Sequence, residues 1–247
     1  MKQKYIIGDS RDVLKNIHGV NLVVTSPPYN VGKEYEEVLT LNEYEQMLTE
    51  VYTACYNSMV EDSRICVNAP SNMKHPDGFL FNPAYHNYNA LLKSGFNYRE
   101  TIIWAQGRDS QTAWGSWKSP SAPWLRHQTE IIYIFYKGNW KLGRVGESCL
   151  TTEEFMHYVV DLWTMKPAQR KKNGHPAPFP TELPRRCIKL FCYVGDIVLD
   201  PFAGRGTTLR ACRETNRFGI GIEKNPKYED ELKDFALINN PRLDFYV

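Results

Sequence analysis

The sequence places hydrogen-bond acceptors and an aromatic ring directly after a short apolar run at positions 21–24. That run leads into Ser26-Pro27-Pro28-Tyr29. Two consecutive prolines remove two backbone N–H donors and fix the direction of the chain, so main-chain carbonyls there are free to accept hydrogen bonds from a ligand. Ser26 adds a side-chain acceptor, and Tyr29 adds a ring that can stack on a planar group. The motif predicts a ligand site; a rigid turn with a packed Tyr29 is the alternative.

A glycine turn near the C-terminus forms a second motif. Residues 198–208 have the pattern of a strand, a tight turn and the start of a helix. Gly204 and Gly206 allow positive φ and a close approach of the backbone to a ligand, and Thr207 suits the opening of the helix. Glu223 ends the next apolar run, where an acidic side chain can accept both hydroxyls of a ribose. The spacing differs from the dinucleotide fingerprint, but turn and acid together favour a nucleoside-type cofactor over an ordinary connection.

Two further positions could contact such a ligand. Asp9 closes the first apolar run, where it would serve as a cofactor contact or as a helix cap. Phe179 lies in the proline-rich stretch 175–184, which predicts an extended entry into a helix with Thr181 as its N-cap. Phe179 would then project toward a pocket, unless the stretch only stiffens the helix entry. The histidines have no spacing typical of a metal site, so no metal is predicted.

The elements that must hold these motifs are predicted from hydrophobic periodicity. Continuous apolar runs are typical of parallel strands that are covered on both faces, and amphipathic stretches between them are typical of helices. The sequence therefore predicts an α/β fold with a doubly wound, mostly parallel sheet. We interpret residues 1–247 as a single domain in which 105–174 supply loop-rich insertions. The predicted strands are 5–7, 21–24, 64–67, 101–104, 131–135, 197–199 and 218–222, and the predicted helices are 41–59, 183–193 and 207–215.

Composition excludes several classes of protein. With 247 residues and 42% hydrophobic side chains, the chain can bury a sizeable core, and disorder is not expected. A net charge of +2 does not by itself mark a nucleic-acid binder, although acidic residues elsewhere can mask a local basic face. The six cysteines show no zinc-type spacing and are expected to be buried free thiols. The sequence shows neither a signal peptide nor a long apolar run, which predicts a cytoplasmic protein with no membrane contact.

Taken together, the two motifs resemble those of the DNA amino-methyltransferases, the N4-cytosine/N6-adenine class. That family carries an (Asp/Asn/Ser)-Pro-Pro-Tyr catalytic loop and a Phe-x-Gly-x-Gly cofactor loop. Here these are Ser26-Pro27-Pro28-Tyr29 and Phe202-Ala203-Gly204-Arg205-Gly206, in the order of the permuted β group. The stretches 117–126 and 175–180 are also similar to segments of such enzymes, so the resemblance spans nearly the whole chain.

The resemblance implies a fold of the S-adenosylmethionine-dependent (Rossmann-like) methyltransferase type and a set of cofactor contacts. Phe202, Gly204 and Gly206 would line the S-adenosylmethionine pocket, together with the start of the helix at Thr207. Asp200 would lie near the methionine end, and Glu223 would hold the ribose hydroxyls. The resemblance also implies that Asp9 would lie near the adenine edge and that Phe179 would pack at the cofactor. The target-recognition element would lie between the strand near 131–137 and residue 175, with the 105–127 loop sharing its work.

The implied reaction is methylation of an exocyclic amine of a base in DNA. Such an amine is a poor nucleophile because its lone pair is conjugated with the ring. The Ser26 hydroxyl and the Pro27 carbonyl can accept its hydrogens and favour a pyramidal nitrogen. The base must leave the double helix to reach this pocket, where the Tyr29 ring can stack on it.

Several readings of the target and partners stay open. Serine at the first motif position is associated with N4-cytosine enzymes, so cytosine N4 is favoured over adenine N6. Methylation of RNA or of a protein amide is a further alternative, as is a non-catalytic DNA-binding subunit. The expected partner is double-stranded DNA in a restriction-modification context, with a cognate restriction endonuclease and a homodimer both open.

Overall fold

The computed structural model describes residues 3–32, 38–107, 115–168, 179–228, 232 and 236–239. Nine strands form one sheet, and a small two-stranded ribbon, β4 (Met73–Lys74) and β5 (Leu80–Phe81), lies apart from it. In spatial order the sheet contains β11 (Ala236–Asn239), β1 (Gln3–Ile7), β10 (Phe218–Glu223), β9 (Ile197–Asp200), β2 (Val20–Thr25), β3 (Met59–Ala69), β7 (Thr129–Tyr136), β6 (Asn97–Ala105) and β8 (Leu162–Thr164).

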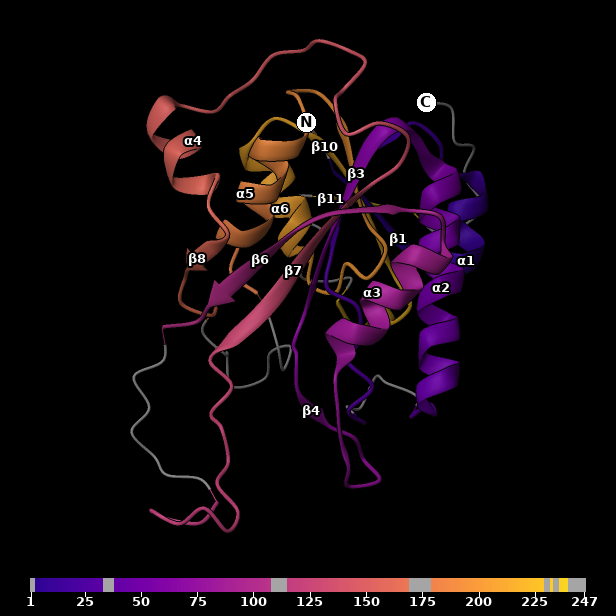
Figure 1. The fold of residues 1–247 in the computed structure, drawn as a ribbon. Coiled ribbons are helices and arrows are strands. Elements are labelled where there is room, and N and C mark those ends of the chain that lie inside the picture. The colour runs from indigo at the N-terminus through magenta and orange to yellow at the C-terminus, as the bar shows by residue number, and fades with distance from the viewer. Residues whose placement is uncertain are drawn as a thin grey trace.

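Helices cover both faces of the sheet, as the apolar runs predicted. Figure 1 shows α2 and α3 on one side and α5 and α6 on the other. The three predicted helices are confirmed as α2, α5 and α6, within a few residues at their ends. The described helices are α1 (Ser10–Val13), α2 (Leu41–Ser58), α3 (Pro83–Lys93), α4 (Thr152–Tyr158), α5 (Glu182–Phe191) and α6 (Thr207–Glu214), with 3₁₀ turns η1 (Leu14–Asn16) and η2 (Pro226–Tyr228).

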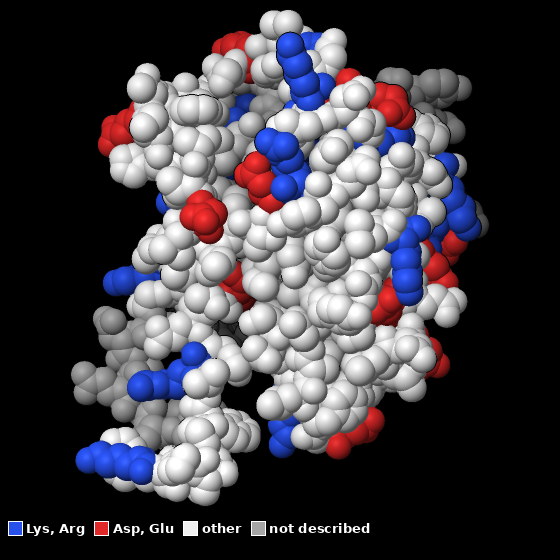
Figure 2. All heavy atoms as spheres, in the orientation of Figure 1, with Lys and Arg blue, Asp and Glu red and all other residues white. Residues whose placement is uncertain are grey.

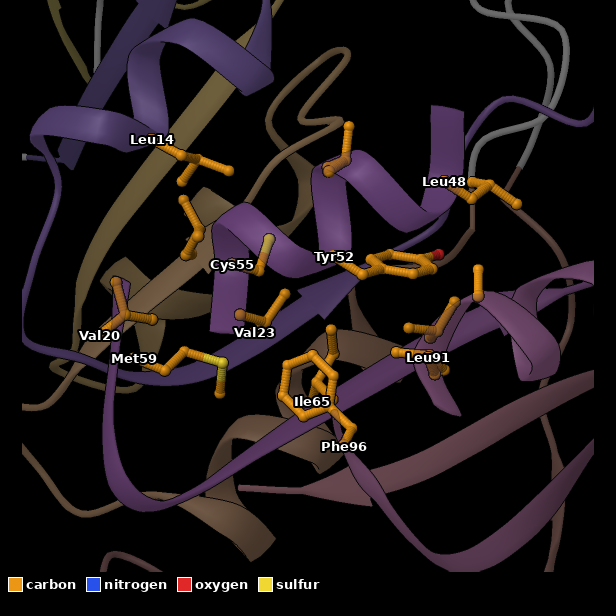
Figure 3. Close-up of a cluster of buried hydrophobic side chains, with 14 of the residues drawn as sticks. Leu14, Val20, Val23, Leu48, Tyr52, Cys55, Met59, Ile65, Leu91 and Phe96 are labelled. Atoms are coloured by element: carbon orange, nitrogen blue, oxygen red, sulfur yellow. The ribbon is translucent and has the colours of Figure 1, made fainter. Parts of the chain in front are cut away.

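Alternate residues of the central strands supply two separate cores. Val23 of β2 and Ile65 of β3 point toward α2 and belong to one core cluster with Leu48 and Tyr52 of that helix (Figure 3). Leu22 and Val24 of β2, on the opposite face, belong to a second cluster with residues of α5 and α6. Each strand is thus buried on both faces, which explains why its sequence is a continuous apolar run.

The direction of one strand differs from the prediction. The run 131–135 was expected to be parallel to its neighbours, but β7 pairs antiparallel with both β3 and β6. β6 and β7 are consecutive in the chain, and Ala105 pairs with Thr129 at the ends nearest their connection. An antiparallel pair needs no crossover helix, and an apolar run buried on both faces has the same composition in either direction.

Local helix signals are only partly matched by side-chain contacts. Thr40 caps α2 in a capping box with Glu43. Thr181 occupies the predicted N-cap position of α5, but its side chain makes no capping hydrogen bond. Its backbone angles are already helical, whereas capping side chains usually sit on an extended residue.

The other expectations about composition can be compared with the described residues. All six cysteines are free thiols, and five of them are buried. No group of His, Cys, Asp and Glu in the described part of the chain could hold a metal ion. None of the helices described is both long and apolar enough to cross a bilayer.

Candidate functional site

Both sequence motifs lie at one edge of the sheet, where the carboxyl ends of parallel strands meet. Asp9 follows β1, Ser26 follows β2, Phe202 follows β9 and Glu223 ends β10. These four strands are adjacent and parallel. A cavity of about 430 Å³ opens between the motifs, which is within the usual range for a small-molecule site. The predicted residues that line it are Asp9, Ser26, Pro27, Pro28, Tyr29, Phe179, Phe202, Gly204, Thr207 and Glu223.

The glycine turn keeps its shape because glycines stand where its backbone approaches β10. Gly204 and Gly206 have φ of 48° and 71°, which glycine adopts without strain. Ala203 donates from its N–H to the Ile222 carbonyl at 2.9 Å, which fixes the turn to β10. A Cβ on Gly221 would lie 2.8 Å from the Ala203 Cβ. The turn therefore lies tightly against β10, next to Glu223.

Glu223 presents a preorganised carboxylate to the cavity. Its Oε2 accepts the Gly204 N–H at 2.8 Å, and its Oε1 accepts the Asn225 N–H at 2.9 Å. Burial raises the pKa of Glu223, and these backbone hydrogen bonds oppose that shift. A carboxylate offers about four lone-pair sites, so each oxygen retains capacity for a further donor. Two adjacent hydroxyls, as on a ribose, fit this arrangement.

Asp9 acts both as a helix cap and as part of the cavity wall. Its carboxylate accepts the backbone N–H of Arg11 at 3.0 Å and caps α1. The Arg11 guanidinium donates to it as well, at 2.9 and 2.7 Å, and these side-chain hydrogen bonds lower the pKa of Asp9. Phe179 also lines the cavity, while residues 175–178 of its motif lie outside the described residues.

The Ser-Pro-Pro-Tyr loop is held by hydrogen bonds from other elements. Tyr44 of α2 donates to the Pro28 carbonyl at 2.9 Å. The Ser26 and Tyr29 hydroxyl oxygens are 2.7 Å apart. Tyr29 is only 7% exposed, and burial raises the pKa of its phenol well above the usual value. The loop thus presents the Ser26 hydroxyl and the proline backbone to the cavity on a rigid support.

Two of the expected cofactor residues, Asp200 and Gly206, are not among those that line the cavity, and their cofactor contacts stay a prediction. Asp200 is 1% exposed and accepts hydrogen bonds from Thr25 and Thr208, both at 2.7 Å, and from the Phe202 N–H at 3.1 Å. Its carboxylate therefore connects three segments of the chain. Gly206 has a related structural role, as the left-handed residue that precedes α6.

Three polar residues beside the Ser-Pro-Pro-Tyr loop were not identified from the sequence. Glu130 at the start of β7 accepts hydrogen bonds from Asn68 of β3 and from Gln106, each at 2.7 Å. Its Oε2 also lies 3.4 Å from the Tyr29 hydroxyl. The available signal was a carboxylate directly before the apolar run 131–135, but nothing local connects it to Tyr29, which is 101 positions away.

Comparisons with known proteins agree with this geometry. The family model of the DNA methylases of the N6/N4 type matches residues 20–234. The type II methyltransferase M.MjaVI of Methanocaldococcus jannaschii is 37% identical over 158 residues, which cover 62% of this chain and 79% of that protein. M.MjaI of the same organism is 27% identical over 290 residues, covering 99% and 95%. A solved putative DNA modification methylase of Thermus thermophilus, in complex with S-adenosyl-L-methionine, has a TM-score of 0.75 and 26% identity over 98% of this chain and all of that one.

The buried Asp200 carboxylate predicts a specific pH dependence of stability. Burial raises the pKa of Asp200 to about 6 from its ordinary value of 3.8, so the native state holds a proton that the unfolded chain releases. Asp200 therefore contributes to the free energy of unfolding below about pH 4, and this contribution is lost as the pH rises to about 6. Two pKa units correspond to about 3 kcal/mol.

The measurement is urea unfolding of wild type and Asp200→Asn at several pH values from 4 to 7. Asn keeps the shape of the side chain but does not titrate, so the stability of wild type relative to the variant should fall across this window and then level off. Parallel stability curves for the two proteins would contradict the assignment.

Proposed function

Because the chain belongs to the DNA methylase family, we propose that it methylates the exocyclic N4 of cytosine in DNA, using S-adenosylmethionine as its cofactor. The observation that carries this proposal is the position of two acceptors beside the cofactor cavity. The Ser26 hydroxyl and the Pro27 carbonyl both belong to residues that line it. No other described residue donates a hydrogen bond to the Pro27 carbonyl, so both atoms can receive the hydrogens of an amine.

The cofactor residues fit S-adenosylmethionine. Glu223 would hold the ribose hydroxyls, and the turn at Phe202 and Gly204 would let the cofactor approach the backbone closely. Phe179 and Asp9 would contact its remaining surface. When bound, the cofactor supplies an electrophilic methyl group on a sulfonium. The protein's contribution is then to align the amine with that methyl group and to exclude water.

Serine at the first motif position supports cytosine as the target. A neutral hydroxyl is a weak base, so Ser26 accepts a hydrogen bond from the amine but does not remove its proton beforehand. The proton leaves after methyl transfer, when the nitrogen is cationic. The Tyr29 ring would stack on the flipped-out base, which can return about 1–3 kcal/mol of the cost of removing it from the helix. In this family Ser-Pro-Pro-Tyr is associated with N4-cytosine enzymes.

We assign DNA contact to the β6–β7 connection, of which the structure describes residues 106–107 and 115–128. A backbone pairing of Gly115 with Pro123 and hydrogen bonds around Ser116 fold this segment into a compact turn. Trp117 and Leu125 at its surface are 71% and 82% exposed, as exposed apolar side chains at a binding surface would be. The connection, residues 106–128, contains three basic residues and one acidic residue, Asp109; its basic residues are Arg108, Lys118 and Arg126. This connection protrudes at the lower left of Figure 1, and Figure 2 shows only basic charges there.

A cognate restriction endonuclease fits the same proposal, since both archaeal relatives are type II methyltransferases. The loop-rich region 105–174 would carry target recognition within a single methyltransferase domain. Assembly into a homodimer stays a prediction.

The reaction is tested by incubating the protein with DNA and methyl-labelled cofactor, digesting the DNA and identifying the methylated nucleoside by mass spectrometry. We expect N4-methylcytosine with wild type and a loss of about a hundredfold or more with Ser26→Ala. N6-methyladenine as the sole product would overturn the cytosine assignment while leaving a DNA methyltransferase. A lack of labelled DNA would overturn the function itself.

The ribose assignment predicts that Glu223→Ala weakens cofactor binding. Hydrogen bonds to a charged group contribute about 1.5–3 kcal/mol, so the affinity measured by calorimetry should fall about ten- to hundredfold. Glu214→Ala is the control, because Glu214 is an exposed residue near the end of α6. Equal affinities of Glu223→Ala and wild type would count against this role.

Removal of two basic side chains from the β6–β7 connection should weaken DNA binding without affecting the cofactor. For Lys118→Ala/Arg126→Ala we expect the slope of log K against log salt to decrease in magnitude by about 2, roughly one for each lost phosphate contact. Lys141→Ala is the matched control, since this exposed lysine follows the opposite end of β7. An unchanged slope in the double variant would place the DNA elsewhere.

A further inference from the structure

A polar cluster lies directly behind the catalytic loop. Its centre is Glu130, and its other members are Asn68, which is 1% exposed, and Gln106, which is 5% exposed. The Asn68 amide donates to Glu130 Oε2 and the Gln106 amide donates to Oε1, both at 2.7 Å. Each carboxylate oxygen thus receives one amide donor. The side chains come from three separate segments, so the arrangement belongs to the fold and not to a local turn.

The side-chain amides of Asn68 and Gln106 are oriented with their N–H groups toward the Glu130 carboxylate. Asn68 Oδ1 is buried and has no hydrogen-bond partner among the described residues. An unsatisfied buried carbonyl is costly, yet rotating the amide to expose a different atom would place this oxygen against the carboxylate. The cluster therefore tolerates an unpaired oxygen while keeping two donors on Glu130.

Hydrogen bonds connect this carboxylate with the catalytic serine through Tyr29. The Tyr29 hydroxyl lies 3.4 Å from Glu130 Oε2 and 2.7 Å from Ser26 Oγ. Burial and the neighbouring Glu130 carboxylate raise the pKa of Tyr29, so its phenol keeps its proton. The 3.4 Å distance between the Tyr29 hydroxyl and Glu130 Oε2 is long for a hydrogen bond, whereas the 2.7 Å distance to Ser26 Oγ is ordinary.

The direction of these hydrogen bonds decides what Ser26 offers to a substrate. A phenol and an aliphatic hydroxyl each carry one hydrogen. If Tyr29 donates to the carboxylate, Ser26 donates to the Tyr29 oxygen and turns its lone pairs toward the cavity. In the opposite direction Ser26 would point its hydrogen at the cavity, where the target amine is itself a donor.

We propose that Glu130 is a positioning residue that, through Tyr29, orients the Ser26 hydroxyl as an acceptor for the target amine. This inference rests on the proposed methyl transfer at Ser26 but does not depend on which base is modified. Glu130 neither touches the base nor takes a proton. It acts as the acceptor that fixes the direction of both hydroxyl hydrogens.

The test is a double-mutant cycle with Glu130→Gln and Tyr29→Phe, measured as single-turnover methyl transfer at saturating cofactor and DNA. An amide at position 130 can donate to Tyr29 and reverse the chain, and Phe keeps the ring but removes the connection. We expect each variant to slow transfer about ten- to hundredfold, with cofactor and DNA affinities within about twofold of wild type. Because both changes break one chain, the double variant should be no more than about twofold slower than the slower single variant.

Multiplied effects in the double variant would overturn the inference, because Glu130 would then act independently of Tyr29. A wild-type rate in either single variant would overturn it too. Tyr29→Phe decides the matter even if Glu130→Gln fails to fold, since the phenol oxygen is the necessary connection. Glu100→Gln on β6 is the control for loss of a carboxylate, as its side chain is 64% exposed. If the wild-type protein methylates DNA at any base, the proposed function stands whatever the cycle shows. If it transfers no methyl group to DNA, both the proposed function and this inference are overturned.

Discussion

The buried Asp200 carboxylate is the interaction on which the geometry of the site depends. It accepts hydrogen bonds from Thr25, the residue before the Ser-Pro-Pro-Tyr loop, from Thr208 in α6 and from the backbone of Phe202. A buried carboxylate is stable only when such donors surround it. One side chain therefore sets the spacing between the Ser-Pro-Pro-Tyr loop and the glycine turn at 202–206. Its absence from the cavity lining is consistent with this role, because a ligand contact would compete for the same lone pairs.

The order of the strands explains how a few hydrogen bonds can hold the two motifs together. β9 lies between β10 and β2 in the sheet, so the cofactor turn has Glu223 on one side and Ser26 on the other. Thr25 and Asp200 are 175 positions apart in the chain but within hydrogen-bonding distance. The parallel directions of these strands place all their carboxyl ends at one edge. In our proposal the connection between the antiparallel strands β6 and β7 contacts DNA, as loops on a rigid sheet commonly carry binding residues.

Polarity at the site follows a consistent pattern of acceptors. In our proposal Glu223 accepts from ribose hydroxyls, and the Pro27 carbonyl and Ser26 accept from an amine, so every proposed ligand group is a donor. A serine hydroxyl can donate as well as accept, which makes it the ambiguous member of this set. The Glu130 cluster removes that ambiguity in our proposal, because a carboxylate held by two amide donors leaves Tyr29 only one direction in which to donate.

The sequence by itself determined the fold class, most of the elements and the residue types of both motifs. These features depend on local properties: apolar runs for buried strands, prolines for a rigid loop and glycines for positive φ. The tertiary structure decided the direction of β7, the structural role of Asp200 and the place of Glu130 behind Tyr29. Each of these depends on which distant segments meet. A carboxylate that faces a ligand and one that ties three segments together look the same in sequence, because the difference lies only in the donors that folding brings to them.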